Sequence, residues 1–360
     1  MPPRKRTAGQ TRGKLPGHDT DPAAKELPTS ARGETTTPRK RFASTKVEVE
    51  GREEIKIVER PELEPAPWGE TAKLSIVGQR IPRADALEKV TGRARYTADV
   101  VRPAMLHAAF VRSPVASGRV RQLDLERALA LPGVRGALVA ADVPGVMHGG
   151  APMFDATIHW AGQPLAALCA DTPELARRAV ALVHLAVDET PHAVTVDAAL
   201  APDAPLVRPA GNVPPKQPRL AARGDVDAAI AGADVVIERE YRTPCALHTA
   251  MEPHGAVAEW NGDHLTVWES TQGIFQVRKD VARSFKLPLN RVRVMKDYMG
   301  GGFGAKNYAA AHTYAAVALA RKLGRPVRCI LDREGEQTDT GNRAATVQRV
   351  TLAARLDGTL

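Results

Sequence analysis

Residues 300–306 read Gly-Gly-Gly-Phe-Gly-Ala-Lys. Glycine loses more backbone freedom on ordering than any other residue, so three in a row suit neither a helix nor a strand. Before this loop, Val292 and Val294 alternate with arginines in the period-2 pattern of a half-buried strand. After it, the alanine-rich segment 308–323 stops before Gly324, as a helix does. The order strand, glycine loop, helix predicts a site for an anionic or oxo-bearing ligand at the helix N-terminus.

Two familiar phosphate-binding loops fit this stretch poorly. A Walker loop ends in Gly-Lys-Ser/Thr, whereas residues 305–307 read Ala-Lys-Asn and offer no hydroxyl for magnesium. The dinucleotide pattern G-x-G-x-x-A is formally present in residues 300–305. That pattern also needs an acidic residue about 20 positions later to hold the ribose, and residues 306–331 contain no Asp or Glu. A nucleotide site of either kind is therefore disfavoured.

Further motifs run along the chain in a fixed order. They lie at residues 77–83, 88–92, 94–96, 112–114, 162–164, 250–254 and 270–273, ahead of the glycine loop. In order and spacing they resemble the molybdenum-binding subunit of the xanthine dehydrogenase/aldehyde oxidase family. The bacterial aldehyde dehydrogenase type, with that subunit as a separate chain, is most similar. The resemblance implies an α+β fold: an α/β hammerhead domain, then the first part of a mixed α/β molybdopterin-binding domain.

The resemblance also implies a cofactor and the residues that contact it. In this family a molybdopterin, here expected in its cytosine dinucleotide form, holds the molybdenum through its dithiolene, so no protein metal ligand is expected. Gln272 matches the position whose side-chain amide donates to an oxo ligand of the metal. Gly301, Gly302, Phe303 and Gly304 match the loop positions that lie against the cofactor, where close backbone approach requires a missing Cβ.

Several of these residues also have plainer interpretations. Gln272 fits an ordinary polar residue at a strand end, and Phe303 fits a core aromatic. Lys306 fits equally a group that neutralises cofactor charge and a solvated cation. His254 fits a packed strand residue better than a ligand. Asn307 stands where purine-oxidising members of the family carry a glutamate, which favours an aldehyde over xanthine as substrate.

No catalytic residue is assigned. The chain closes on Leu-Asp-Gly-Thr-Leu, where Asp357-Gly358 predicts a hairpin turn. The family's subunit continues further, and its catalytic glutamate is expected beyond residue 360. Glu334 and Glu336 lie in the polar stretch 332–339, which predicts a solvated loop. The cysteines are far apart and form no C-x-x-C pair, so neither zinc nor an iron–sulfur cluster is indicated.

Two functions of different class follow. In the first, the chain is a molybdenum hydroxylase subunit that oxidises aldehydes or N-heteroaromatics with water as the oxygen source. The resemblance implies a 2Fe–2S subunit and an FAD subunit as partners that carry electrons away. In the second, the chain lacks the catalytic glutamate and is an inactive cofactor-binding or assembly module, with a basic tail as its contact surface.

Composition sets wider limits. The 43% hydrophobic and 25% charged residues are ordinary for a soluble globular protein, and no apolar run reaches the roughly 18 residues of a membrane span. Unpaired cysteines favour a reducing compartment, so a cytoplasmic location is expected, with export beside a signal-bearing partner left open. Residues 1–46 carry +7 of the net charge of +9. Few apolar residues accompany that charge, so a solvated tail without nucleic acid is expected.

The domain layout follows from these patterns. Thr172-Pro173 predicts the start of a helix, and Asn261-Gly262 predicts the turn of a hairpin. Further predictions are strands at 165–168, 235–241 and 327–331 and a helix at 275–285. The predicted parts are a disordered basic tail at 1–70, the hammerhead domain at 71–200, a Pro-rich linker at 201–222, and the N-terminal part of the molybdopterin domain at 223–360.

Overall fold

The computed structural model describes residues 41–49, 52–60, 69, 73–208, 210–213, 221 and 223–359. The chain divides into two compact units, of which the larger comprises residues 48–53 and 73–360. None of the helices in the described part of the chain has the length and apolar character needed to cross a membrane.

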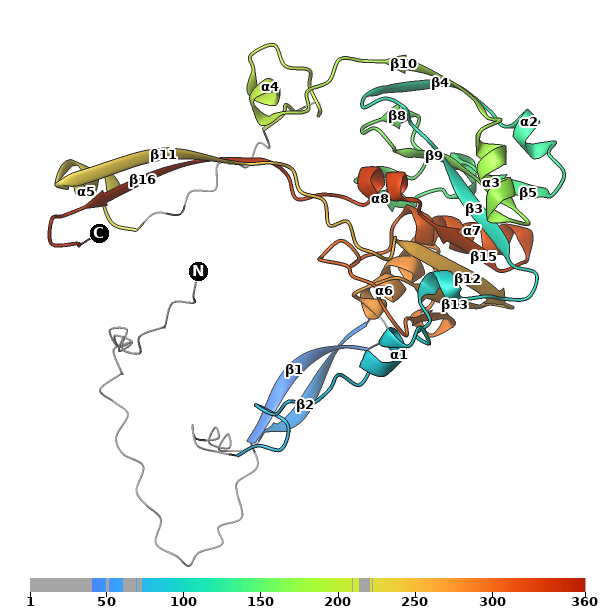
Figure 1. Ribbon diagram of the computed structural model, residues 1–360, viewed down its shortest axis with the longest axis horizontal. Helices are drawn as coiled ribbons and strands as arrows, with labels where there is room; N and C mark the ends of the chain where they lie inside the picture. The colour runs from blue at the N-terminus through green and yellow to red at the C-terminus, as the bar shows by residue number, and fades with distance from the viewer. Residues whose placement is uncertain are drawn as a thin grey trace, which may run out of the picture. The chain divides into compact units, whose positions relative to one another are not determined.

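Two strands near the N-terminus form a small sheet of their own. β1 (Arg41–Val49) pairs with β2 (Arg52–Arg60) (Figure 1). The prediction of a disordered tail over 1–70 is wrong for these strands. Aliphatic and charged residues alternate in part of β2, a pattern that favours a strand. The prediction of disorder relied on the overall charge of the segment and did not take this local pattern into account. The remainder of the predicted tail, apart from Gly69, lies outside the described residues.

The main element of the larger unit is a mixed seven-stranded sheet in the order β14-β13-β12-β15-β3-β9-β5. Its strands are β3 (Leu106–Arg112), β5 (Val134–Leu138), β9 (Pro164–Ala170), β12 (Gly255–Asn261), β13 (His264–Glu269), β14 (Val292–Met295) and β15 (Val327–Ile330). The predicted β12–β13 hairpin is confirmed, with Asn261 paired to His264. β15 pairs in parallel with β3. One sheet therefore continues from the strands predicted for the hammerhead into those predicted for the cofactor domain.

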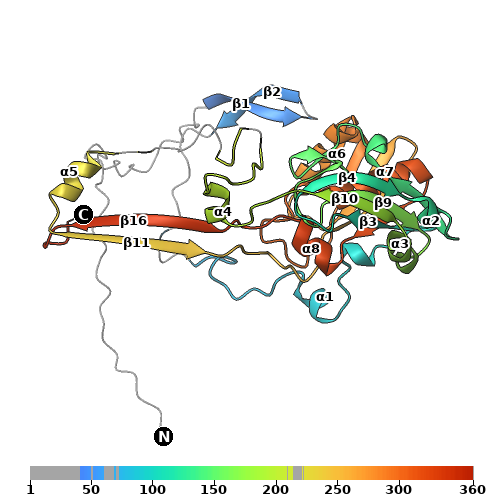
Figure 2. The same cartoon turned by 90° about the horizontal axis from the view of Figure 1, so that it is seen from above.

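Helices cover both faces of this sheet. In β9, Ala167 and Cys169 belong to the core cluster that includes the helix α7 (Ala311–Leu323). The intervening Leu168 packs instead with Ala179 of α3 (Pro173–Val180). Because neighbouring residues of a strand point to opposite faces, α7 and α3 lie on opposite sides of the sheet. α6 (Ile274–Ser284) packs against β14 at the edge of the sheet. Figure 2 shows α7 and α3 on either side of β3 and β9.

The alanine-rich helix begins later than the sequence predicts. α7 starts at Ala311 rather than at residue 308, and it ends at Gly324, whose φ of +64° is left-handed. The residues before it are held from outside the helix, since Ala309 N donates to Asp280 and Lys306 O accepts from Gln272 N. Small alanine side chains let α7 pack closely, and its residues 311–320 are all buried.

Smaller elements surround the sheet. A three-stranded sheet in the order β10-β4-β8 accompanies the hammerhead strands. Thr172 Oγ1 accepts from Leu175 N, which confirms the predicted start of α3. The described parts of the predicted linker contain no helix or strand. The remaining short elements are α1 (Ala86–Val90), β4 (Gly118–Asp124), α2 (Glu126–Leu129), β6 (Met147–His148), β7 (Ala151–Pro152), β8 (Thr157–Ile158), β10 (His184–Glu189) and α4 (Val196–Leu200).

Four further elements lie after residue 223. β11 (Val235–Thr243) pairs antiparallel with β16 (Thr346–Ala354), and α5 (Val226–Ala231) precedes β11. The prediction of a solvated loop over 332–339 is wrong, because α8 (Arg333–Asp339) occupies it. Asp332 caps this helix by accepting a hydrogen bond from Gly335 N at 2.8 Å.

Candidate functional site

The glycine loop turns sharply after β14. Gly301, Phe303 and Gly304 all have left-handed φ values, +100°, +50° and +93° respectively. Such values are ordinary for glycine but strained for phenylalanine. Phe303 as a whole residue is 74% exposed, so the interpretation as a core aromatic is wrong. An aromatic held in a strained conformation and directed away from the core is typical of functional loops.

The loop is not itself a helix N-terminus, in contrast to the prediction. Gly300 N donates to the Glu252 carboxylate and Gly304 N donates to Gln272 Oε1. The helix α7 starts only at Ala311. Within the described part of the chain, the N–H groups of Gly301, Gly302 and Phe303 have no hydrogen-bond partner. Three successive N–H donors in such a turn can bind an anionic or oxo-bearing group without a helix dipole.

Gln272 is attached to the loop through one end of its amide. Its Oε1 accepts from Gly304 N at 2.9 Å and from Lys306 N at 3.3 Å, while its backbone N donates to Lys306 O at 2.7 Å. The exposed Nε2 has no hydrogen-bond partner among the described residues. Because the carbonyl end is fixed, the amide N–H₂ is left free to donate to a ligand.

At two loop glycines a Cβ would meet a neighbouring side chain at close range. A Cβ on Gly302 would lie 2.5 Å from Gln272 Oε1, and one on Gly300 would lie 2.6 Å from the Cβ of Glu252. By contrast, a Cβ on Gly304 would point into open space. The expectation that the missing Cβ of Gly304 lets the loop backbone approach the cofactor therefore stays a prediction, and its left-handed φ by itself favours glycine there.

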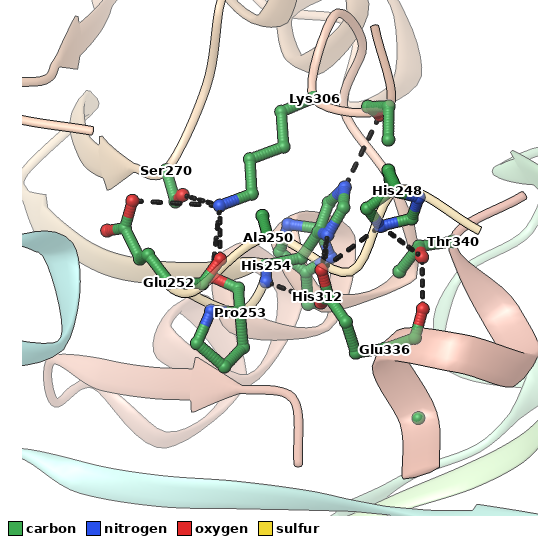
Figure 3. A network of polar contacts seen from close by, with 12 residues as sticks. His248, Ala250, Glu252, Pro253, His254, Ser270, Lys306, His312, Glu336 and Thr340 are labelled. Carbon is green, nitrogen blue, oxygen red and sulfur yellow. Dashed lines mark hydrogen bonds and ion pairs between the residues drawn. The ribbon is translucent and has the colours of Figure 1, made fainter. Parts of the chain in front are cut away.

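Lys306 connects the loop to the segment before β12. Its side chain is 0% exposed, and Nζ donates to Glu252 O at 2.6 Å and to Ser270 Oγ at 2.7 Å (Figure 3). Glu252 in turn accepts from Gly300 N at 2.7 Å. The solvated interpretation of Lys306 is wrong. Burial lowers the pKa of Lys306, and the nearby Glu252 carboxylate opposes that shift.

Glu336 is buried, in contrast to the solvated position that its polar surroundings predict. Its side chain is 0% exposed and accepts from His254 N at 2.7 Å, from His254 Nδ1 at 2.9 Å and from His248 Nε2 at 3.1 Å (Figure 3). Burial disfavours its ionised form, yet the hydrogen bonds from His254 and His248 outweigh burial and lower its pKa to about 2. His254 is buried, as predicted, but it lies directly before β12 rather than in a strand.

This lowered pKa predicts a loss of stability in acid. The ordinary pKa is 4.5 and the folded value is about 2. The stabilisation by Glu336 is therefore complete above pH 4.5 and is lost as the pH falls toward 2. In wild type, this group should make the free energy of unfolding fall by on the order of 3 kcal/mol between neutral pH and pH 2, and Glu336→Gln should lack this fall. Urea unfolding of both proteins between pH 2 and 7 measures it, with the exposed Glu334→Gln as the control. Equal slopes for wild type and Glu336→Gln would contradict the assignment.

The sequence singles out Gln272 and the loop glycines, and the structure brings them together. The sequence does not identify His248 and Glu336 as neighbours of His254. Only the packing of α8 against the start of β12 brings these residues together. One signal in the sequence could have predicted α8. Asp332 is a residue type that often caps a helix, and in the structure it accepts from Gly335 N three positions later. The roles of Gln272 and the loop toward a cofactor stay predictions.

Comparison with known proteins gives two family matches. Residues 91–191 match the aldehyde oxidase and xanthine dehydrogenase a/b hammerhead domain, and residues 212–360 match the molybdopterin cofactor-binding domain. The predicted fold class is confirmed.

Individual relatives agree with these matches. The chain is 34% identical over 296 residues to the aldehyde oxidoreductase molybdenum-binding subunit PaoC of Escherichia coli, covering 79% of this chain and 39% of that protein. It is 31% identical over 292 residues to the nicotinate dehydrogenase large molybdopterin subunit of Eubacterium barkeri, covering 79% of this chain and 68% of that one. The chain thus spans about two fifths of the length of the Escherichia coli relative.

Solved structures show the same likeness. Quinoline 2-oxidoreductase from Pseudomonas putida 86 superposes with a TM-score of 0.69 at 28% identity, over 76% of this chain and 37% of that one. Aldehyde oxidoreductase from Desulfovibrio gigas superposes with a TM-score of 0.67 at 26% identity, over 77% of this chain and 32% of that one. The chain belongs to the molybdenum-binding subunits of the xanthine dehydrogenase and aldehyde oxidase family.

Proposed function

We propose that this chain supplies part of the cofactor site of a molybdenum hydroxylase that oxidises aldehydes with water as the oxygen source. The observation that carries the proposal is the Gln272 amide, whose carbonyl end is fixed by Gly304 N and Lys306 N while its N–H₂ end meets no partner in the described part of the chain. That arrangement fits a cofactor bearing oxo groups, because it offers a neutral, oriented donor beside a loop with unpaired N–H groups.

The chain's own residues would hold and orient the cofactor. When bound, a molybdopterin supplies a redox-active Lewis-acid metal for transfer of a water-derived oxygen to the substrate. Gln272 would donate to an oxo group, and the N–H groups of Gly301, Gly302 and Phe303 would face the cofactor. The exposed Phe303 ring would cover the site and limit the access of water. The cytosine dinucleotide form of the cofactor is part of this proposal.

Asn307 supports an aldehyde rather than a purine substrate. Its Nδ2 donates to Gly304 O at 3.0 Å, so the amide is engaged with the loop itself. A neutral amide committed in this way is a weaker partner for a polar heterocycle than a free carboxylate. N-heteroaromatic rings, the class named for the quinoline and nicotinate relatives, remain the alternative substrates.

The proposed assembly contains further chains. A 2Fe–2S subunit and an FAD subunit would accept the electrons, and the catalytic base would come from protein outside these 360 residues. We place the assembly in the cytoplasm, without nucleic acid or membrane. The second candidate, an inactive cofactor-binding or assembly module, shares the same loop and differs only in turnover.

The test is to purify the chain together with the products of its neighbouring genes. We expect about one molybdenum per chain and dye-linked oxidation of aromatic and aliphatic aldehydes. Aldehydes should be preferred over xanthine, in line with Asn307. Molybdenum without turnover would favour the assembly module, and protein free of both molybdenum and turnover would contradict the proposal.

A further inference from the structure

The buried pair His254 and Glu336 lies behind the glycine loop rather than within it. Glu336 receives three hydrogen bonds there, two from His254 and one from His248. On its other side, His254 Nε2 lies 3.3 Å from Ala305 O in the loop. A continuous chain of contacts therefore runs from a carboxylate of α8, through an imidazole, to one carbonyl of the loop (Figure 3).

The Ala305 carbonyl is a sensitive point of the loop. Its oxygen and Lys306 N–H belong to the same planar trans peptide unit, so they point in opposite directions. When His254 holds the oxygen on one side, the N–H is directed to the other side, where it donates to Gln272 Oε1. The orientation of this peptide thus places one of the two N–H groups that hold Gln272 with its N–H₂ end outward, the other being that of Gly304.

The hydrogen-bond geometry also shows which ring nitrogen of His254 donates to the loop. Both ring nitrogens of His254 face oxygen acceptors, Glu336 at Nδ1 and Ala305 O at Nε2. A carbonyl oxygen can only accept, so the contact with Ala305 O needs a hydrogen on Nε2. The nearby carboxylates each have a partner of their own: Glu336 lies beside His254, Glu252 beside Lys306, and the buried Glu269 beside His312.

A cation site is the competing interpretation, because His248, His254 and Glu336 offer three ligand atoms within 4.8 Å of one another. The protein already supplies a partner for each of these atoms. Glu336 Oε2 accepts from a backbone N–H at 2.7 Å, and His248 Nε2 also lies 3.1 Å from Thr340 Oγ1. The cluster is complete without an ion.

We propose that His254 and Glu336 are positioning residues that orient the Ala305–Lys306 peptide and thereby fix Gln272 for ligand binding. The inference rests on the proposed function in one respect only, namely that Gln272 contacts the cofactor. The orientation of the peptide itself is independent of any cofactor.

The first test compares Glu336→Gln with Glu334→Gln in the full chain. Both carboxylates lie in α8, but Glu334 is exposed. Loss of a hydrogen-bonded buried charge should speed amide hydrogen exchange at Gly304 and Lys306 by roughly tenfold or more. Exchange at Val257 and Val267 in the sheet should change little, and Glu334→Gln should resemble wild type throughout. Unchanged exchange at Gly304 and Lys306 in Glu336→Gln would overturn the proposal.

A second test needs no folded Glu336 variant. In the wild-type chain labelled with ¹⁵N-histidine, His254 should show a hydrogen on Nε2, the nitrogen that faces Ala305 O. Its signals are assigned by their loss in His254→Gln. A His254 Nε2 without a hydrogen would overturn the proposal, as would stoichiometric zinc in the purified protein that is lost in His254→Gln.

These readouts separate the positioning role from the proposed function. If wild type lacks molybdenum while the exchange and the Nε2 hydrogen behave as expected, the positioning role stands and the proposed function fails. If wild type carries molybdenum, the molybdenum content per chain of Glu336→Gln should be about tenfold lower than that of Glu334→Gln. Full retention of molybdenum despite a loosened loop would refute the link to Gln272.

Discussion

Gly302→Ala is expected to remove most of the molybdenum and of the turnover from the assembled enzyme. The new Cβ would lie 2.5 Å from Gln272 Oε1 and 2.6 Å from its Cδ. Gly302 has no left-handed φ, so alanine fits the backbone and the effect arises from displacement of Gln272. We expect a loss on the order of 10- to 100-fold, as is usual when a group that orients a metal site is removed. Metal analysis and dye-linked aldehyde oxidation measure it.

Gly232→Ala provides the matched control. A Cβ at Gly232 would lie 3.4 Å from the nearest atom, an ordinary contact, and this glycine follows α5 rather than the loop. The control should retain molybdenum and activity. If Gly302→Ala also retained both, the placement of Gln272 beside the cofactor would be incorrect.

Lys306→Met is expected to destabilise the fold more than other single lysine replacements. Methionine fills the volume but leaves Glu252 O and Ser270 Oγ without the donor that Nζ supplies at 2.6 and 2.7 Å. It also leaves the Glu252 carboxylate without its cation, 3.6 Å away. Removing one partner of a buried ion pair costs about 3–5 kcal/mol. Urea unfolding of the full chain should show a loss of this order in the free energy of unfolding.

Lys322→Met, in α7, is the control for this loss. Its Nζ pairs with Asp142 at 2.7 Å, but the side chain is 44% exposed. An exposed pair contributes only about 0–1 kcal/mol. If both variants lost equal stability, Lys306 would not hold the loop in the way that its buried contacts indicate.

Much of the architecture could be predicted from local patterns. The β12–β13 hairpin, the helix capped by Thr172 and the glycine loop each depend on residues close together in the chain, whose backbone preferences act wherever they are placed. The order of the motifs was sufficient to predict the fold class. The first turn of α7 was predicted too early, because contacts from Gln272 and Asp280 hold the preceding residues outside the helix.

The amino-acid pattern alone established the glycine loop, the amide at Gln272 and the family fold, because those features require particular residue types at particular places. The hydrogen-bond partners of the buried charged residues became known only from the tertiary structure. Glu336 and His254 are 82 positions apart, and Lys306 and Ser270 are 36 apart. A charged residue is solvated unless distant segments enclose it and supply its partners. Its burial is therefore a property of the assembled layers, which no local pattern records.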